Sequence, residues 1–244
     1  MGKKTMQPET FIEQTRPFID YMIGWYNGLQ PLSLAELVDG EPESVGIVSV
    51  DVIKGFCTVG PLSSPRVNTI VPPIARLFAD AWSEGVRDMA LAQDAHPQDA
   101  VEFGDYPPHC IRGSEEAETV DAFTNLPFFD EIKVIEKNSI SVGQTDEFNE
   151  WLDERNHITK WIMVGDCTDL CTHQLAMHVR LRANQNQLAG VRVIVPVNAV
   201  NTYDTPVDVA REHGIPAHDA DFMHLTFLYH MMTNGIEVYT EITE

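Results

Sequence analysis

From Val45 onward, short runs rich in β-branched residues alternate with longer amphipathic segments. This alternation is typical of βα units around a mostly parallel sheet. Most of the runs are apolar throughout, as expected for strands that are buried on both faces. The pattern therefore predicts an α/β fold with three layers, α/β/α. Its sheet of about six strands would lie at residues 45–50, 89–92, 132–135, 161–164, 191–195 and 236–239.

Two segments between these strands have helical periodicity. One helical face in the first collects Val67, Ile70, Val71, Ile74, Phe78 and Ala81. Pro72 and Pro73 predict where regular helix begins, because proline is tolerated in the first turn. We expect the stripe in the second segment to pack on the sheet; it consists of Leu170, Met177, Leu181 and Leu188. Leu175 and Val179 form a second face, which predicts a helix buried on two sides, as at a subunit contact.

Residues 1–44 differ from the rest of the chain. Their apolar residues indicate a short helix; they are Phe11, Phe18, Ile19, Met22, Ile23 and Trp25. An acidic, turn-rich segment follows at residues 39–43. We interpret residues 1–44 as an N-terminal helical extension of a domain that spans residues 45–244. The extension could pack on that domain or contribute to oligomer contacts, and the sequence leaves both roles open.

The charge and the cysteine content restrict the partners and the compartment. The chain has 16 Lys plus Arg against 37 Asp plus Glu, a net charge of −21. This charge repels phosphate backbones and anionic lipids, which disfavours nucleic acid and membrane surfaces as partners. There is no apolar run of about 20 residues and no signal peptide pattern at the start, so we expect a cytoplasmic protein. Four cysteines are too few for a disulfide framework.

Ionisable residues follow four of the predicted strands: Asp51, Asp94, Lys137 and the segment 166–171. In an open parallel sheet the ligand binds beyond the carboxyl ends of the strands. One acidic residue at such a place is more often a helix cap than a catalyst. Their coincidence at the ends of four strands predicts a functional site at this edge.

Cys171 lies in a polar turn, GDCTDLC, that leads from a predicted buried strand into a helix. Backbone N–H groups at a helix N-terminus favour a thiolate and can hold an oxyanion. If Lys137 and Asp51 converge there, the ammonium would lower the pKa of the thiol, and the carboxylate could accept its proton. Cys167 and Cys171 could instead ligate zinc. That alternative is weaker because no second cysteine pair stands nearby.

A second group of polar residues comprises Asp94, His96, Glu102 and His109. In extended backbone, residues two apart point the same way, so Asp94 and His96 can share one cation. His109 would complete a set of two histidines and a carboxylate that suits a divalent metal. Asp-x-His alone is a weak signal, and a turn with a surface histidine is the alternative. Prolines in these loops favour a rigid site.

Several of these motifs occur together in one order: VDVIKGFC (50–57), DAHP (94–97), YPPHC (106–110), EKNS (136–139) and GDCTDLC (165–171). In this order and spacing the chain resembles the isochorismatase-like cysteine hydrolase superfamily, and within it the nicotinamidases most of all. The resemblance runs from about Val45 to the C-terminus, and it implies the isochorismatase-like hydrolase fold.

The resemblance implies a catalytic triad of Asp51, Lys137 and Cys171 that hydrolyses a carboxamide through a thioester. It also implies an oxyanion hole formed by the backbone amides of Cys167 and Cys171, and a cis peptide bond between Asp166 and Cys167.

A divalent metal is implied as well, with zinc as the first expectation and manganese or iron as alternatives. The matching ligands are Asp94, His96 and His109, with Glu102 as a less regular fourth, directly or through water. In nicotinamidases the metal coordinates the pyridine nitrogen of nicotinamide. Phe56 and Tyr106 match positions where aromatic rings pack on the substrate. The family further implies a homo-oligomer and a role in NAD salvage.

Two departures from the family pattern leave the substrate open. Ile53 stands where the family often has glutamine, and Ser139-Ile140-Ser141 replaces a usual Ser-Ala-Phe. Another small amide or ureide is therefore an alternative to nicotinamide. A different class of function, a non-catalytic oligomeric binding module on this scaffold, is disfavoured because Asp51, Lys137 and Cys171 are all present. The alkylation rate of Cys171 would discriminate a reactive thiol from an inert one.

Overall fold

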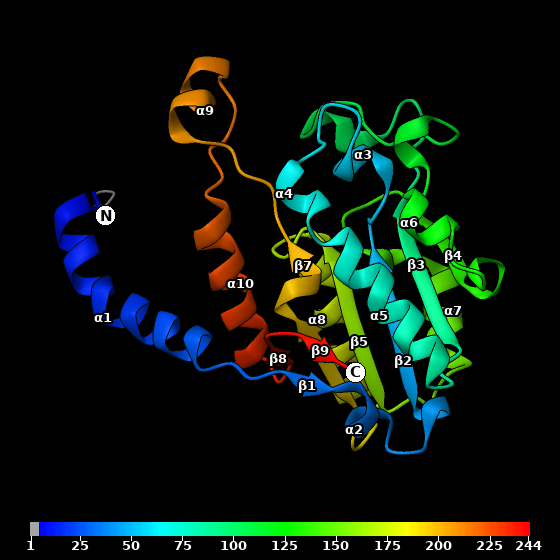
Figure 1. Ribbon diagram of the computed structural model, residues 1–244. Coiled ribbons are helices and arrows are strands. Elements are labelled where there is room, and N and C mark those ends of the chain that lie inside the picture. The colour runs from blue at the N-terminus through cyan, green and yellow to red at the C-terminus, as the bar shows by residue number, and fades with distance from the viewer. Residues whose placement is uncertain (1–4) are drawn as a thin grey trace.

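The computed structural model describes residues 5–244, and a parallel sheet forms its centre (Figure 1). All six predicted strands are present: β2 (Val45–Val50), β3 (Asp88–Asp94), β4 (Lys133–Lys137), β5 (Lys160–Asp166), β6 (Arg192–Pro196) and β8 (Glu237–Tyr239). They lie in the order β4-β3-β2-β5-β6-β8, with every neighbouring pair parallel. A short seventh strand, β7 (Val200–Asn201), pairs with β5. The order reverses between β2 and β5, where such sheets bind ligands.

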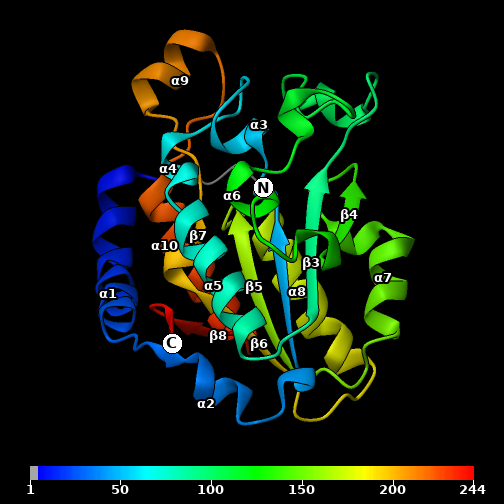
Figure 2. The same cartoon turned by 45° about the vertical axis from the view of Figure 1, so that its right-hand side comes forward.

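Helices cover both faces of the sheet, as the three-layer prediction requires (Figure 2). One face carries α4 (Pro65–Asn68), α5 (Val71–Ser83) and α6 (Asp121–Thr124), and the other carries α7 (Asp146–Asp153), α8 (Cys171–Gln185) and α10 (Ala220–Thr233). Successive residues of β2 alternate between the two cores, with Ile47 in the first and Val48 in the second. Both faces of the strand are buried, so it is apolar throughout.

The face predicted between the first two strands is buried at every position named. The prediction for α8 is wrong at one position: Leu170, Met177 and Leu188 pack at least partly on the core, and the predicted second face of Leu175 and Val179 is buried. Leu181, which we expected to pack on the sheet, is 50% exposed, whereas Leu175, Ala176, Val179 and Ala183 are buried. The buried side of α8 thus combines Leu175 and Val179 with two alanines, and Leu181 lies outside it. Alanine allows the helix to approach the strands closely.

The N-terminal helix is longer than the predicted short helix. α1 (Pro8–Asn27) lies beside α10 (Figure 1), and its Met22 is buried. After it, β1 (Leu32–Ser33) pairs with β9 (Ile242–Thr243). The next helix, α2 (Leu34–Val38), places Leu34 in the core on the α5 side of the sheet. Residues 18–38 thus pack on the domain, whereas Phe11 and Ile12, near the start of α1, are 46% and 52% exposed. A role in oligomer contacts and the domain boundary at residue 44 stay predictions.

Loops and short helices gather beyond the carboxyl ends of the strands. α3 (Lys54–Cys57) follows β2, and α9 (Val207–His213) projects from the same end (Figure 2). The remaining short elements are the 3-10 turns Pro42–Ser44, Val101–Gly104, Glu115–Ala117, Phe129–Glu131, Val142–Gln144 and Val197–Ala199. Within residues 5–244, no helix is both long enough and apolar enough to cross a bilayer.

Candidate active site

Lys137 is the centre of the site. It is the last residue of β4, and its side chain has no exposed surface. Its Nζ atom lies 2.7 Å from Oδ2 of Asp51, 2.5 Å from Oδ1 of Asp94 and 3.8 Å from Sγ of Cys171. The ammonium therefore joins residues from the ends of β2, β3, β4 and β5. This convergence of the predicted Asp51, Lys137 and Cys171 follows from the strand order.

Asp51 is positioned by the backbone as well as by Lys137. It follows β2 with a left-handed φ of 59°, its own N–H donates to the Ala92 carbonyl, and its Oδ1 accepts the N–H of Asp94 at 3.0 Å. Burial raises the pKa of Asp51 to about 7, and the charge of Asp94 adds to this rise against the opposing effect of Lys137. A carboxylate with a pKa near neutrality is a stronger proton acceptor than an ordinary aspartate.

Cys171 is the first residue of α8, where backbone N–H groups have no acceptor within the helix. Burial raises the pKa of its thiol well above the ordinary value; Lys137 opposes this rise, while Asp51 and Asp94 add to it. Lys137 does lower the pKa of the thiol, as expected, but burial outweighs this effect and the pKa is raised overall. The ammonium is shared between two carboxylates, so it cannot also offset the burial of the sulfur. Cys171 is held as a thiol beside a carboxylate that can accept its proton.

The turn before Cys171 has the predicted backbone. The Asp166–Cys167 peptide bond is cis. Gly165 has a φ of 119°, and a Cβ atom there would lie 2.0 Å from the Val50 carbonyl oxygen. Only glycine permits this close approach between β5 and β2.

Asp94, His96 and His109 form a buried group whose potential ligand atoms all lie within 4.8 Å of one another. Oδ2 of Asp94 faces Nε2 of His96 at 3.4 Å and Nε2 of His109 at 3.9 Å. Two backbone hydrogen bonds bring the histidine loops together: the N–H of His96 donates to the Cys110 carbonyl, and the N–H of Arg112 donates to the His96 carbonyl.

The histidine tautomers suit a divalent metal. Nδ1 of His109 donates to the Pro107 carbonyl at 2.8 Å, and Nδ1 of His96 lies 2.7 Å from Oδ1 of Asn138. Both Nε2 atoms are thereby left as acceptors toward Asp94, and Nε2 of His96 is buried without a hydrogen-bond partner among residues 5–244. An orphaned buried nitrogen beside a carboxylate and a second imidazole fits a metal with nitrogen and oxygen ligands.

Glu102 lies outside this compact group. It belongs to the 3-10 turn Val101–Gly104. Burial lowers the pKa of His96, but the nearby Asp94 carboxylate outweighs burial and raises it, and the charge of Glu102 adds to this rise. Glu102 is thus close enough to act on His96 electrostatically. Direct ligation by Glu102 stays a prediction.

Aromatic rings surround the histidines. The predicted Phe56 and Tyr106 lie with their ring centroids 5.7 Å and 6.3 Å from that of His109. Burial raises the pKa of Tyr106, and Glu102 and Cys171 are among the charges that add to the rise. Phe103, which was not predicted, packs edge-on against both His96 and His109. Asn138 was also missed, although its place directly after Lys137 was a usable signal.

A second polar group supports the nucleophile turn and was not predicted. Oδ2 of Asp169 lies 2.8 Å from Nε2 of His218, whose ring stacks on Tyr203 at a centroid distance of 4.0 Å. Nδ1 of His218 donates to the Tyr203 carbonyl. His218 is 49 residues from Asp169 in the sequence, and no local pattern connects the two.

Comparison with known proteins agrees with this geometry. Residues 45–217 match the family model described as the isochorismatase domain. The chain belongs to the isochorismatase family. It is 30% identical over 222 residues to Nicotinamidase 1 of Arabidopsis thaliana, a match that covers 85% of this chain and 90% of that protein. The chain is thus an isochorismatase-family hydrolase, as the sequence resemblance predicted.

Solved structures share the fold at lower sequence identity. The pyrazinamidase of Pyrococcus horikoshii in complex with zinc is 21% identical, with a TM-score of 0.59 over 80% of this chain and 98% of that one. The N-carbamoylsarcosine amidase of Thermoplasma acidophilum is 20% identical, with a TM-score of 0.59 over 80% of this chain and 95% of that one. These likenesses confirm the predicted three-layer α/β/α fold of the isochorismatase-like hydrolases.

Proposed function

We propose that this protein is a metal-containing cysteine amidase that converts nicotinamide and water to nicotinate and ammonia. One observation carries the proposal: the Lys137 ammonium contacts Asp51, Asp94 and Cys171 at once, so a nucleophile, a base and a metal ligand share one buried cation. The similarity to a plant nicotinamidase supports this choice of substrate.

The residues have separate tasks in the proposed reaction. Asp51 accepts the thiol proton as Sγ of Cys171 bonds to the carboxamide carbon. The developing oxyanion is held by the backbone N–H groups of Cys167 and Cys171. Asp51 then returns the proton to the leaving nitrogen, so that ammonia departs and a thioester remains. A water molecule gives a proton to Asp51 as its oxygen attacks the thioester carbon. Asp51 passes this proton to the departing Sγ, which releases the carboxylic acid and restores the thiol.

Asp94, His96 and His109 would hold the divalent metal, with Glu102 as a fourth ligand, directly or through water. When bound, the ion supplies a Lewis acid that can orient a pyridine nitrogen, and zinc, manganese and iron all suit this donor set. Phe56 and Tyr106 would pack on the ring of the substrate and exclude water from the thioester.

One assay, applied to the unmodified protein and to Cys171→Ala, tests the proposal. Purified protein supplied with zinc or manganese is incubated with nicotinamide, and ammonia and nicotinate are measured. We expect equal amounts of both products and loss of turnover in Cys171→Ala. No release from the metal-loaded protein, or equal release from Cys171→Ala, would contradict the proposal.

The departures at Ile53 and at residues 139–141 favour one alternative, another small amide or ureide hydrolysed by the same residues. A panel of aliphatic amides, aromatic amides and ureides, compared by kcat/KM, separates the two. We further propose a cytoplasmic homo-oligomer that acts in NAD salvage, and gel filtration with light scattering tests the assembly.

A further inference from the structure

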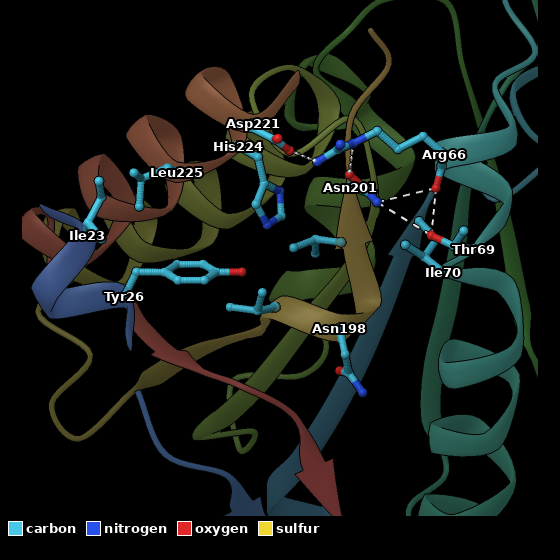
Figure 3. Close-up of a pocket in the computed structure, with 12 residues that line it drawn as sticks. Ile23, Tyr26, Arg66, Thr69, Ile70, Asn198, Asn201, Asp221, His224 and Leu225 are labelled. Carbon is cyan, nitrogen blue, oxygen red and sulfur yellow. Dashed lines mark hydrogen bonds and ion pairs between the residues drawn. The ribbon is translucent and has the colours of Figure 1, made fainter. Parts of the chain in front are cut away.

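A cavity of about 410 Å³ lies apart from the triad and the metal group. Its walls come from α1, from α10, from the α4–α5 region and from the segment after β6 (Figure 3). Neither the triad nor the metal group lines it. Both α1 and α10 fall outside residues 45–217, the part that matches the family model. The cavity therefore lies between the family core, which supplies lining residues in 66–70 and 197–201, and two helices outside that core.

The cavity presents hydrogen-bonding groups on apolar walls. Figure 3 shows the hydroxyl of Tyr26 and the ring of His224 pointing into it. Nδ1 of His224 is hydrogen-bonded to the hydroxyl of Thr168 at 2.8 Å, so Nε2 remains available to a ligand. The apolar wall residues are Ile23, Ile70, Val197, Val200 and Leu225. The volume falls within the roughly 300 to 1,000 Å³ that is typical of small-molecule sites.

The charges in the cavity cancel. Arg66, its cation, pairs with Asp221 at 2.7 Å and donates from Nε to Oδ1 of Asn201 at 2.8 Å. Burial lowers the pKa of His224 to about 4, so its ring is neutral near pH 7. An ionic ligand would have no uncompensated opposite charge to meet, whereas an uncharged molecule loses little on entering.

Two hydrogen bonds connect the cavity to the nucleophile turn. Thr168, which follows Cys167, bonds through its hydroxyl to His224 and donates its backbone N–H to the Asn201 carbonyl at 2.9 Å. Both partners of Thr168 line the cavity. A ligand that touches His224 and Asn201 thus acts on both bonds that hold Thr168 in place.

We propose that this cavity is a second small-molecule site, which binds an uncharged, largely apolar molecule with a hydrogen-bonding edge, of the aromatic amide class, and which is coupled through Thr168 to the turn that carries Cys171. Tyr26 and His224 bind the polar edge, and the aliphatic residues contact the ring. Because coupling is reciprocal, occupancy of either site changes the affinity of the other.

Benzamide is a suitable probe, since its ring has no nitrogen to coordinate a metal. The full chain carrying Cys171→Ala is titrated with benzamide and followed by amide-resolved NMR, so the result does not depend on turnover. We expect the amide signals of Tyr26, Asn201 and His224 to shift saturably, and that of Thr168 to follow with the same dissociation constant.

Adding Tyr26→Phe and His224→Gln to this protein should weaken that binding at least tenfold. Tyr21→Phe is the matched control, because Tyr21 is a 63% exposed tyrosine on the same helix, and it should leave the affinity unchanged. Absence of saturable shifts, or equal affinity in the protein with both changes, would overturn the proposal. The proposal would also be overturned if the same signals shifted when the protein concentration is raised without benzamide. That result would mean that a second copy of the chain closes the cavity.

Discussion

Lys137 and Asp94 join the catalytic and metal-binding halves of the site through one carboxylate. Oδ1 of Asp94 contacts Nζ of Lys137 at 2.5 Å, and Oδ2 of the same residue faces Nε2 of His96 at 3.4 Å. Burial alone would raise the pKa of Asp94, but Lys137 and His96 outweigh it and hold the pKa below its ordinary value. Asp94 is therefore ionised, as a metal ligand must be.

Replacing Lys137 by glutamine should inactivate and destabilise the protein. The change leaves the carboxylates of Asp51 and Asp94 buried without a cation, which typically costs about 3 to 5 kcal/mol. We expect kcat/KM to fall by about a thousandfold or more, because the base and the nucleophile both lose their position. Urea unfolding and steady-state kinetics measure the two effects.

Lys133→Gln is the matched control on the same strand. Lys133 is 44% exposed and pairs with Glu147 at the surface, where such pairs contribute about 0 to 1 kcal/mol. The Lys133→Gln change should leave kcat/KM within about twofold of the value for the unmodified protein. Similar losses in both variants would show that any lysine on β4 has this effect and would contradict the role of Lys137.

Asn138→Ala should weaken metal binding by about ten- to a hundredfold, because the side chain orients the ring of His96. Competition with a fluorescent zinc chelator measures the affinity. Asn149→Ala is the control. It removes a comparable hydrogen bond, 2.9 Å to Nε2 of His178, away from the metal group, so the zinc affinity should stay unchanged. Equal zinc affinity in the wild type and Asn138→Ala would contradict the proposed ligand set.

Metal removal should lower the melting temperature, and added zinc or manganese should restore it, because only the folded chain brings Asp94, His96 and His109 together. Thermal melts before and after chelation measure this. A melt that does not change after verified metal removal would rule out a stabilising ion.

Gly165→Ala should destabilise the fold by at least about 3 kcal/mol, because the added Cβ overlaps the Val50 carbonyl and the backbone is left-handed. Gly190→Ala separates these causes. Its φ is 79°, but a Cβ there meets nothing within 4 Å, so only the conformational cost of about 1 to 2 kcal/mol applies. Equal losses in urea unfolding would contradict the close approach of β5 to β2.

Much of this architecture could be predicted from the sequence. Strands such as β2 are buried on both faces, so their apolar runs are continuous, and the ionisable residues at their ends meet because parallel strands end at one edge. The face of α8 was mispredicted because Leu181 is larger and more apolar than Ala183, although the close packing favours the smaller residue. Periodicity alone does not report which face a helix turns toward the sheet.

The groups that were missed depend on contacts between distant segments. Asp169 and His218 meet only because the loop around α9 returns to the nucleophile turn. The raised pKa of Cys171 depends on how Lys137 is shared among three partners, which a motif does not show. The cavity at Tyr26 required knowing that α1 packs beside α10.

Stability should fall as the pH is lowered from 7 to 5. Burial, and then the nearby Arg66, hold the pKa of His224 at about 4 in the folded chain against the opposing charges of Asp221 and Asp169; the ordinary value is 6.5. The unfolded chain binds more protons between these values, so stability is lost as the pH falls through that window, by about 2 kcal/mol at pH 5. Urea unfolding at pH 7 and pH 5 measures this loss, which should be smaller in His224→Gln. An equal loss of unfolding free energy in this variant and in the unmodified protein would contradict the role of His224.

The central claim is that Cys171 forms a thioester with the acyl group of a carboxamide. Intact mass spectrometry after rapid acid quench of the metal-loaded protein with nicotinamide tests it most directly. We predict a transient species in which a nicotinoyl group replaces one proton, located on Cys171 by peptide mapping, absent from Cys171→Ala and retained in Cys57→Ala, whose buried thiol lies outside the triad. Turnover without any adduct on Cys171, or turnover that persists in Cys171→Ala, would contradict the claim.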